Sequence, residues 1–296
     1  MRRSIVAASF LLLGYSLAHA DSPQTKQASV NGVNLTYQEQ GQGKPVVFVP
    51  GAGADYRVWD GERDAVAPHY RFVALTQRYF GTEPWSDDGS RFSMTTHADD
   101  LVGFIRVLNA GPVDIVGWSY SGPIALIVAM QHPELVRGLF LYEPGLISHV
   151  TDPGELQVAT DDRKAVAAPA AAAAKAGDNN EALRLLINGV SNQEPGYFDT
   201  ATPPIHAMLL DNARTLPLFY AAPPPPQITC EQLGQIKMPV TIAKGDSTRT
   251  FYKIAADTAS RCIPGSKLVV IPNGRHVTPM QNPSAFNEVV LTFLSD

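Results

Sequence analysis

The feature that most constrains this 296-residue chain is a short corner at residues 113–122, which reads VDIVGWSYSG. An apolar, β-branched run ends there in small residues around Ser119, and residues 123–130 continue as an apolar, helix-forming segment. A serine on a tight strand-to-helix turn adopts strained backbone geometry, so the residues two before and two after it must be small. Gly117 and Ser121 meet that requirement. The corner therefore predicts that Ser119 is a catalytic nucleophile.

Short apolar runs like the one before this corner recur along the chain. They lie at residues 46–49, 70–75, 113–116, 139–142, 239–243 and 267–271. Runs that are apolar at every position are typical of parallel strands buried on both faces. Helical segments such as 97–108 separate them, and Asn31-Gly32 marks a hairpin within residues 28–40. This alternation predicts an α/β fold with a mostly parallel sheet.

One long stretch interrupts the alternation. From Gly145 to about residue 233 no strand-like run occurs, and helix-forming segments take its place at residues 165–176, 180–189 and 203–216. The four prolines at 223–226 form a stiff extended connector that cannot join a sheet interior. We therefore expect four regions: a leader at 1–20, a first core part at 21–144, a helical cap at 145–235, and a second core part at 236–296.

The leader has the pattern of a secretory signal peptide. Two arginines, an apolar stretch at 4–17 and small residues at 18 and 20 predict cleavage before Asp21, and hence a secreted or periplasmic protein. The alternative is a membrane anchor, but the stretch is shorter than the roughly 20 residues that a span needs, and no later segment is long enough. The chain has a net charge of −5 without a basic patch, which argues against nucleic acid as a partner.

The two cysteines, Cys230 and Cys262, both follow the leader. Export and an even count favour one structural disulfide between them, and a pair of free buried thiols is the alternative. No histidine or further cysteine lies at ligand spacing, so we expect no metal and no cofactor.

Three further residues are candidates for catalysis with Ser119. The backbone N–H groups of Tyr120, at the start of the following helix, and of Ala52, after the first buried run, could stabilise an oxyanion. In the alternative interpretation, the glycines beside Ala52 merely turn the chain. His276 lies on a loop directly after the last apolar run, where the general base is expected.

These motifs together resemble the α/β-hydrolase superfamily over nearly the whole mature length. The matching segments are PGAG at 50–53, QRYFG at 77–81, GWSYSG at 117–122 and GRH at 274–276. The resemblance implies a mostly parallel central sheet, helices on both faces and an inserted helical cap. Pro50, where many members have histidine, and Ser121, where the second elbow glycine is usual, depart from the pattern without removing a catalytic atom.

The acid that should orient His276 has two candidates. Many members of the family carry an aspartate three residues after a glycine at the end of the penultimate strand, and here that place holds Thr248, with Asp246 two residues earlier. Glu143 instead ends the strand that follows the nucleophile's helix, a position used by lactone hydrolases and haloalkane dehalogenases of this family. We favour Glu143, because ligand sites in such sheets form at the carboxyl edge of the strands, and keep Asp246 as the alternative.

A serine at the corner predicts attack on an ester-like carbonyl and an acyl-enzyme. The cap supplies the apolar residues Tyr197, Phe198, Ile205, Met208, Leu209, Leu210, Phe219 and Tyr220. Most of them are expected to pack against the core, but an apolar roof, with Phe80 and Trp118 nearby, suits a small apolar ester or lactone. The alternatives are hydrolysis of amide or carbon–carbon bonds on the same triad, cofactor-free oxygenase or peroxidase chemistry, and a hydrolase-like binding or receptor protein.

Overall fold

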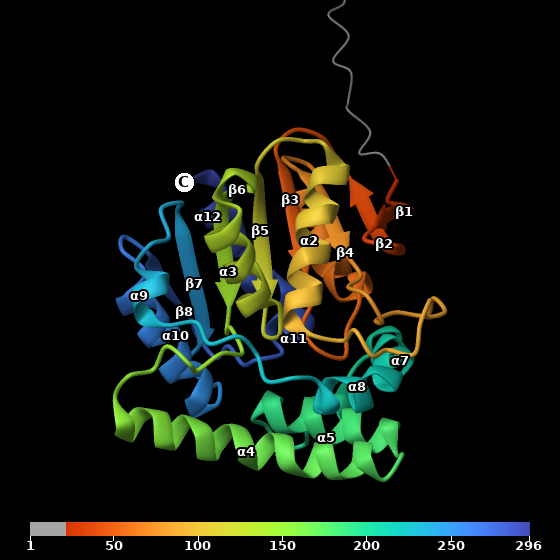
Figure 1. The fold of residues 1–296 in the computed structure, drawn as a ribbon, viewed down its shortest axis with the longest axis vertical. Helices are drawn as coiled ribbons and strands as arrows, with labels where there is room; N and C mark the ends of the chain where they lie inside the picture. The colour runs from red at the N-terminus through yellow and green to blue at the C-terminus, as the bar shows by residue number, and fades with distance from the viewer. Residues whose placement is uncertain (1–21) are drawn as a thin grey trace, which may run out of the picture.

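The computed structural model describes residues 22–296. The expected signal peptide at 1–20 and its cleavage site therefore lie outside the described residues. Figure 1 shows a central sheet with helices on both faces and a layer of further helices at one end of the strands. Among residues 22–296, none of the helices has both the length and the apolar character needed to cross a membrane.

The sheet has eight strands in the order β1-β2-β4-β3-β5-β6-β7-β8. The strands are β1 (Gln24–Val30), β2 (Val33–Gln40), β3 (Pro45–Val49), β4 (Arg71–Leu75), β5 (Val113–Trp118), β6 (Val136–Tyr142), β7 (Val240–Gly245) and β8 (Lys267–Ile271). Strands β1 and β2 form the antiparallel hairpin, β2 pairs antiparallel with β4, and every pair from β4 to β8 is parallel. The predicted fold class is confirmed.

The last strand differs from the expectation of a strand buried on both faces. β8 pairs with β7 at the edge of the sheet, and most of its residues are exposed or half-buried. Leu268 and Val270 are 40% and 46% exposed. An apolar run indicates that a segment forms a strand. Whether that strand lies at the edge of the sheet depends on the order in which the strands pair, and a single run carries no information about that order.

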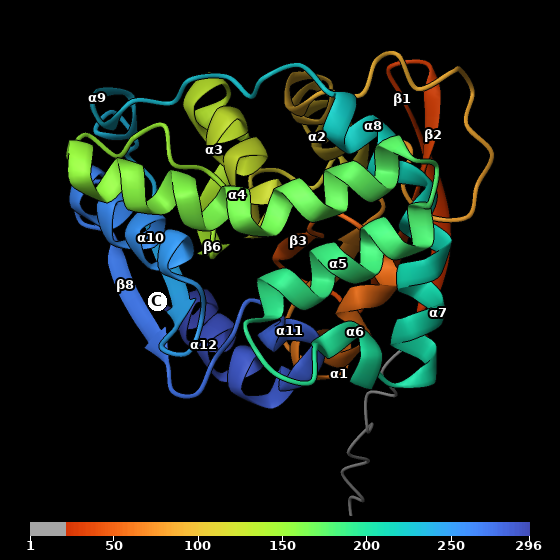
Figure 2. The ribbon, with the colours of Figure 1, turned by 90° about the horizontal axis from the view of Figure 1, so that it is seen from below.

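Helices α2 (Met94–Leu108) and α3 (Ser121–Gln131) cover one face of the sheet, and α1 (Asp60–Val66) and α12 (Pro283–Ser295) cover the other (Figures 1 and 2). α10 (Thr250–Cys262) runs beside β7, and the short α11 (Thr278–Gln281) follows the loop of His276. Two buried apolar clusters form the hydrophobic core of the protein. Their packing fixes the strands whose carboxyl ends carry the candidate site.

A helical insertion separates β6 from β7. Its helices are α4 (Pro153–Lys175), α5 (Asn179–Ser191), α6 (Tyr197–Thr200), α7 (Pro203–Asn212), α8 (Leu216–Ala221) and α9 (Cys230–Leu233). α4 begins before the alanine tract because Asp152 caps it, accepting a hydrogen bond from the N–H of Glu155 at 2.8 Å. Figure 2 shows α4 and α5 lying across the carboxyl end of the sheet, so the insertion roofs the site.

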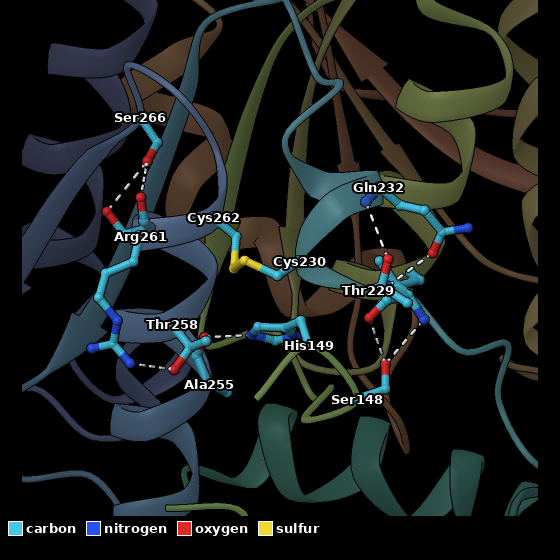
Figure 3. Close-up of a disulfide and its surroundings, with 12 residues drawn as sticks. Ser148, His149, Thr229, Cys230, Gln232, Ala255, Thr258, Arg261, Cys262 and Ser266 are labelled. Carbon is cyan, nitrogen blue, oxygen red and sulfur yellow. Dashed lines mark hydrogen bonds between the residues drawn. A yellow bond between two sulfur atoms is a disulfide. The ribbon is translucent and has the colours of Figure 1, made fainter. Parts of the chain in front are cut away.

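A disulfide joins the end of this insertion to the core. Cys230 in α9 is bonded to Cys262 at the last turn of α10 (Figure 3). Nearby, His149 lies 2.9 Å from the carbonyl oxygen of Ala255 in the same helix, and Ser148 donates to the carbonyl of Ile228 at 2.9 Å. The bridge and the His149 contact tie the two ends of the insertion to α10, and the bond from Ser148 to Ile228 ties these ends to each other.

Candidate active site

The corner at Ser119 has the strained backbone that its sequence predicts. Ser119 has φ of 56°, in the left-handed region that disfavours a side chain. A Cβ added to Gly117 would lie 3.3 Å from the carbonyl oxygen of Ser121, so a larger residue would be tight there. The N–H of Ser119 donates to the carbonyl of Tyr142 in β6 at 3.0 Å. The corner is thus held against the neighbouring strand with the serine at its tip.

Ser121, the departure from the usual glycine, has a structural role at this corner. Its side chain is completely buried, and its hydroxyl accepts a hydrogen bond from the N–H of Trp118 at 2.8 Å. The same hydroxyl donates to the carbonyl of Val49, at the end of β3, at 2.7 Å. A glycine could make neither bond, so here the hydroxyl links the end of β3 to the end of β5.

His276 lies within hydrogen-bond distance of Ser119. Its Nε2 is 2.8 Å from the Ser119 hydroxyl, and its Nδ1 is 2.8 Å from a carboxylate oxygen of Glu143. The indole N–H of Trp118 donates to the His276 carbonyl at 2.9 Å, which holds the loop in place. Burial lowers the pKa of His276, and the hydrogen bond and charge of Glu143 oppose that shift. The imidazole is therefore neutral at pH 7 and able to accept a proton.

Glu143 is fully buried at the carboxyl end of β6. Its backbone has φ of 44°, which turns the side chain back toward His276 instead of continuing the strand. One carboxylate oxygen accepts the N–H of Gly245 at 2.8 Å, and the other accepts the hydroxyl of Thr248 at 2.8 Å as well as facing His276. A buried carboxylate needs such partners, because an unpaired charge in the interior is costly.

The alternative acid lies elsewhere. Asp246 is exposed, and its carboxylate accepts a hydrogen bond from the hydroxyl of the adjacent Ser247 at 2.8 Å. The position at which many family members carry the aspartate is that of Thr248, which donates to Glu143. Of the two carboxylates singled out in the sequence, the structure brings only Glu143 to His276.

The loop after β3 closes against the nucleophile. A Cβ added to Gly51 would lie 3.2 Å from the Cβ of Ser119, so the backbone passes close to the serine. Pro50 accepts a hydrogen bond from the side chain of Gln77 at 3.0 Å, through its carbonyl. Ala52 and Tyr120, the two predicted oxyanion donors, line the same cavity as Ser119. The N-terminus of α3, next to Tyr120, directs its dipole toward this point.

The Tyr120 side chain is anchored behind the site. Its hydroxyl lies 2.9 Å from Nδ1 of the buried His97, in α2. Burial lowers the pKa of His97 to about 4, so this histidine is neutral and is not a competing base.

A cavity of about 360 Å³ opens at Ser119 between the core and the helical insertion. Phe219, Tyr220 and Trp118 line it as expected, whereas Phe80 is buried behind it against Tyr120. Its unexpected lining comes from one face of α5, from the polyproline connector and from the start of α10: Leu186, Ile187, Val190, Pro223, Pro224, Pro225, Phe251 and Tyr252. Among the described lining residues, Arg163 of α4 is the one permanently charged side chain.

Sequence reasoning gave no role to Tyr252, whose ring lies over His276. The two ring centroids are 3.8 Å apart, and the rings are nearly parallel, at 9°. The hydroxyl of Tyr252 is 2.9 Å from Nε2 of His276. No local pattern marks such a residue, because α10 and the His276 loop meet only in the folded protein.

Comparison with known proteins fits this geometry. The model of the alpha/beta hydrolase family matches residues 46–289. The chain belongs to this family.

Curated relatives of this family member include a 2-(acetamidomethylene)succinate hydrolase of Mesorhizobium japonicum, 23% identical over 279 residues that cover 91% of this chain and 95% of the relative. A 2-hydroxy-6-oxo-6-(2'-aminophenyl)hexa-2,4-dienoic acid hydrolase of Metapseudomonas resinovorans is 33% identical over 117 residues, 38% of this chain and 40% of the relative. Among solved structures, Est816, described as an N-acyl homoserine lactone degrading enzyme, matches with a TM-score of 0.71 and 22% identity over 90% of this chain and all of that one. The last likeness shows the shared fold.

Proposed function

We propose that this hydrolase cleaves a carboxylic ester or lactone through an acyl-enzyme on Ser119. The observation that carries the proposal is the continuous hydrogen-bonded chain from Ser119 to His276, which both line the cavity, and on to the buried Glu143. A neutral imidazole within reach of a serine hydroxyl, oriented by a buried carboxylate, is the arrangement that activates serine for acyl transfer.

The residues of the site have distinct roles in the reaction. Ser119 attacks the carbonyl carbon while Nε2 of His276 takes the hydroxyl proton, and the N–H groups of Ala52 and Tyr120 stabilise the oxyanion. Glu143 keeps the proton on Nδ1 and stabilises the imidazolium that forms. His276 then gives its proton to the leaving oxygen, and water repeats the sequence on the acyl-enzyme.

The cavity supports a small, largely apolar substrate. Its walls are mainly aliphatic and aromatic, and its volume of about 360 Å³ lies at the low end for ligand pockets. The similarity to Est816, described as degrading an N-acyl homoserine lactone, favours testing lactones beside linear esters.

A panel of esters, lactones and amides, assayed by pH-stat with wild-type protein and Ser119→Ala, tests the proposal. We expect turnover of esters or lactones by the wild type and a loss of at least about 10⁴-fold in Ser119→Ala. A wild-type protein that turns over none of them would contradict the proposal and favour a binding protein on this fold.

A second candidate is hydrolysis of amide or carbon–carbon bonds on the same three residues. The similarity to the dienoic acid hydrolase over 117 residues is the observation that favours it. Faster turnover of a vinylogous 1,5-diketone or of the amides than of the esters in the same panel would replace the ester proposal with this one.

We also propose that the protein is exported after removal of residues 1–20. The support is the sequence pattern of the leader together with a disulfide, which persists in oxidising compartments. N-terminal sequencing of the protein expressed in a Gram-negative host tests this. A periplasmic product beginning at Asp21 is expected, and a cytoplasmic product retaining Arg2 and Arg3 would contradict it.

A further inference from the structure

Tyr252 occupies a position beside the reacting atoms that the proposed triad leaves unexplained. It lies in the first turn of α10, and its side chain is almost completely buried while lining the active-site cavity. Its ring stacks on His276, and its hydroxyl is 2.9 Å from Nε2, the atom that faces the Ser119 hydroxyl at 2.8 Å. Three groups therefore meet where the proton is transferred.

The hydrogen-bonding capacity of the imidazole sets what Tyr252 can do. With its proton on Nδ1, directed to Glu143, a neutral His276 has a single lone pair on Nε2, in the plane of the ring. Two hydroxyl groups cannot both donate to that lone pair. Because the rings are nearly parallel, the Tyr252 oxygen stands off the imidazole plane, and its O–H is poorly directed at the lone pair. The hydroxyl of Tyr252 is thus a donor for an oxygen atom at this point, and the Ser119 hydroxyl is one such oxygen within its reach.

We propose that Tyr252 is a further catalytic residue, whose hydroxyl donates a hydrogen bond to the leaving-group oxygen as the bond from that oxygen to the carbonyl carbon breaks. This rests on the proposed function of Ser119 and His276. The leaving oxygen must come within reach of Nε2 to receive the proton, and an oxygen there is also beside the Tyr252 hydroxyl.

The step balances without a second proton donor. When the tetrahedral intermediate collapses, the carbon–oxygen bond breaks, its electron pair goes to the leaving oxygen, and the proton of Nε2 moves to that oxygen. Tyr252 keeps its own proton throughout, because burial raises the pKa of its hydroxyl above the usual value. In the second half of the reaction, water takes the place of the leaving group and is held by the same hydroxyl.

This role names a substrate class. A phenolate or enolate is a good leaving group, so a hydrogen bond to its oxygen lowers the barrier only slightly. An aliphatic alkoxide is a poor leaving group with more negative charge on its oxygen, so the same hydrogen bond lowers the barrier much more. Tyr252 therefore equips the site for unactivated alkyl esters and saturated lactones.

The position of Tyr252 is fixed from both ends of its helix. The disulfide holds the last turn of α10 at Cys262, and Asp162 of α4 accepts the N–H of Phe251 at 3.1 Å in the first turn. A donor held in this way needs little reorganisation when charge develops, which is what electrostatic catalysis requires.

The test compares two esters with the same acyl group, ethyl butyrate and p-nitrophenyl butyrate, in Tyr252→Phe and wild type. Phenylalanine keeps the ring stacked on His276 and removes only the hydroxyl. We expect kcat/KM to fall about 10- to 100-fold for ethyl butyrate and less than about threefold for p-nitrophenyl butyrate. The matched control is Tyr197→Phe, which alters a buried tyrosine of α6 outside the cavity and should leave both values unchanged.

An equal loss on the two esters, or no loss on either, would overturn the role of Tyr252, since a merely structural residue would not discriminate by leaving group. Labelling of Tyr252→Phe by a fluorophosphonate at nearly the wild-type rate is expected, because fluoride needs no such help, and it shows that the site is intact. Failure of the wild type on both esters and with the probe would instead refute the proposed function itself.

Discussion

The loops that end β6 and β7 are neighbours at the carboxyl edge of the sheet, yet they carry opposite chemistry. The first ends in Glu143, wholly buried and turned inward with φ of 44°. The second offers the buried site an N–H from Gly245 and a hydroxyl from Thr248, while its own carboxylate, on Asp246, is exposed. One loop supplies the charge, and the other supplies the donors that satisfy it.

This contrast shows how the loop after β7 supports a carboxylate that belongs to the loop after β6. The Thr248 hydroxyl and the His276 Nδ1 are both 2.8 Å from the same oxygen of Glu143, so the carboxylate lies between them. A second carboxylate at position 248 would repel the first, so neutral threonine is the compatible partner. Substitutions in the two loops test this division of roles.

The largest expected effect is from Glu143→Gln. The amide can no longer stabilise the imidazolium, and it favours the wrong tautomer of His276, so kcat for ester hydrolysis should fall about 10³- to 10⁴-fold. Steady-state kinetics checks this, with circular dichroism showing that the variant is folded. A loss below tenfold would mean that Glu143 is not the acid.

The next test moves the charge from one loop to the other. Adding Thr248→Asp to Glu143→Gln places a carboxylate on the β7 loop and should recover about tenfold or more of the lost kcat. The double variant Glu143→Gln with Ser247→Asp adds a carboxylate to the same loop away from the buried position and should recover nothing. Equal recovery in both would show that net charge alone matters.

A smaller effect is expected from Thr248→Val, which keeps the shape and removes the donor to Glu143. We expect about a tenfold loss in kcat, because Glu143 loses one of the hydrogen bonds that hold its carboxylate in position against His276. The pH profile gives a second readout. The wild-type enzyme needs His276 in its neutral form, and the pKa of His276 is lowered below the usual 6.5, so wild-type activity should fall only when the pH drops below 6.5. In Thr248→Val, the hydroxyl no longer shares the charge of the Glu143 carboxylate, so the carboxylate stabilises the imidazolium more strongly. The pKa of His276 should therefore rise, and the acid limb of the kcat/KM profile should move to higher pH.

The smallest effect belongs to Asp246→Asn. Its carboxylate is exposed, accepts a hydrogen bond from the Ser247 hydroxyl and does not reach His276, so kcat should change less than about twofold. A collapse of kcat in this variant would exchange the roles assigned to the two loops.

The sequence predicted part of the active site, but not the pairing of the loops after β6 and β7. Ser119 and His276 were predictable because each follows an apolar run directly, so local order places both at one edge of the sheet. The family and the fold followed from the same runs and are confirmed. The choice between Glu143 and Asp246 depended on which loop faces His276, and the hydrogen bond from Thr248 is visible only after folding.

Other features had no local signal at all. Tyr252 stacks on His276 across a contact between α10 and a loop 24 residues away in sequence. The exposure of β8 follows from its place at the edge of the sheet, and the cavity face of α5 follows from how the insertion is oriented over the strands. Such features arise from pairing and packing between distant segments, which periodicity along one segment cannot encode.

The central claim is that Ser119 is a nucleophile activated through His276 and Glu143. The most direct test is the rate of labelling by a fluorophosphonate, followed by intact mass and peptide mapping, in wild type, Ser119→Ala, Glu143→Gln and Asp246→Asn. We predict one adduct on Ser119 in the wild type, the same rate in Asp246→Asn, labelling slowed at least about 100-fold in Glu143→Gln, and none in Ser119→Ala. An adduct on another residue, or slowing in Asp246→Asn but not in Glu143→Gln, would contradict the account.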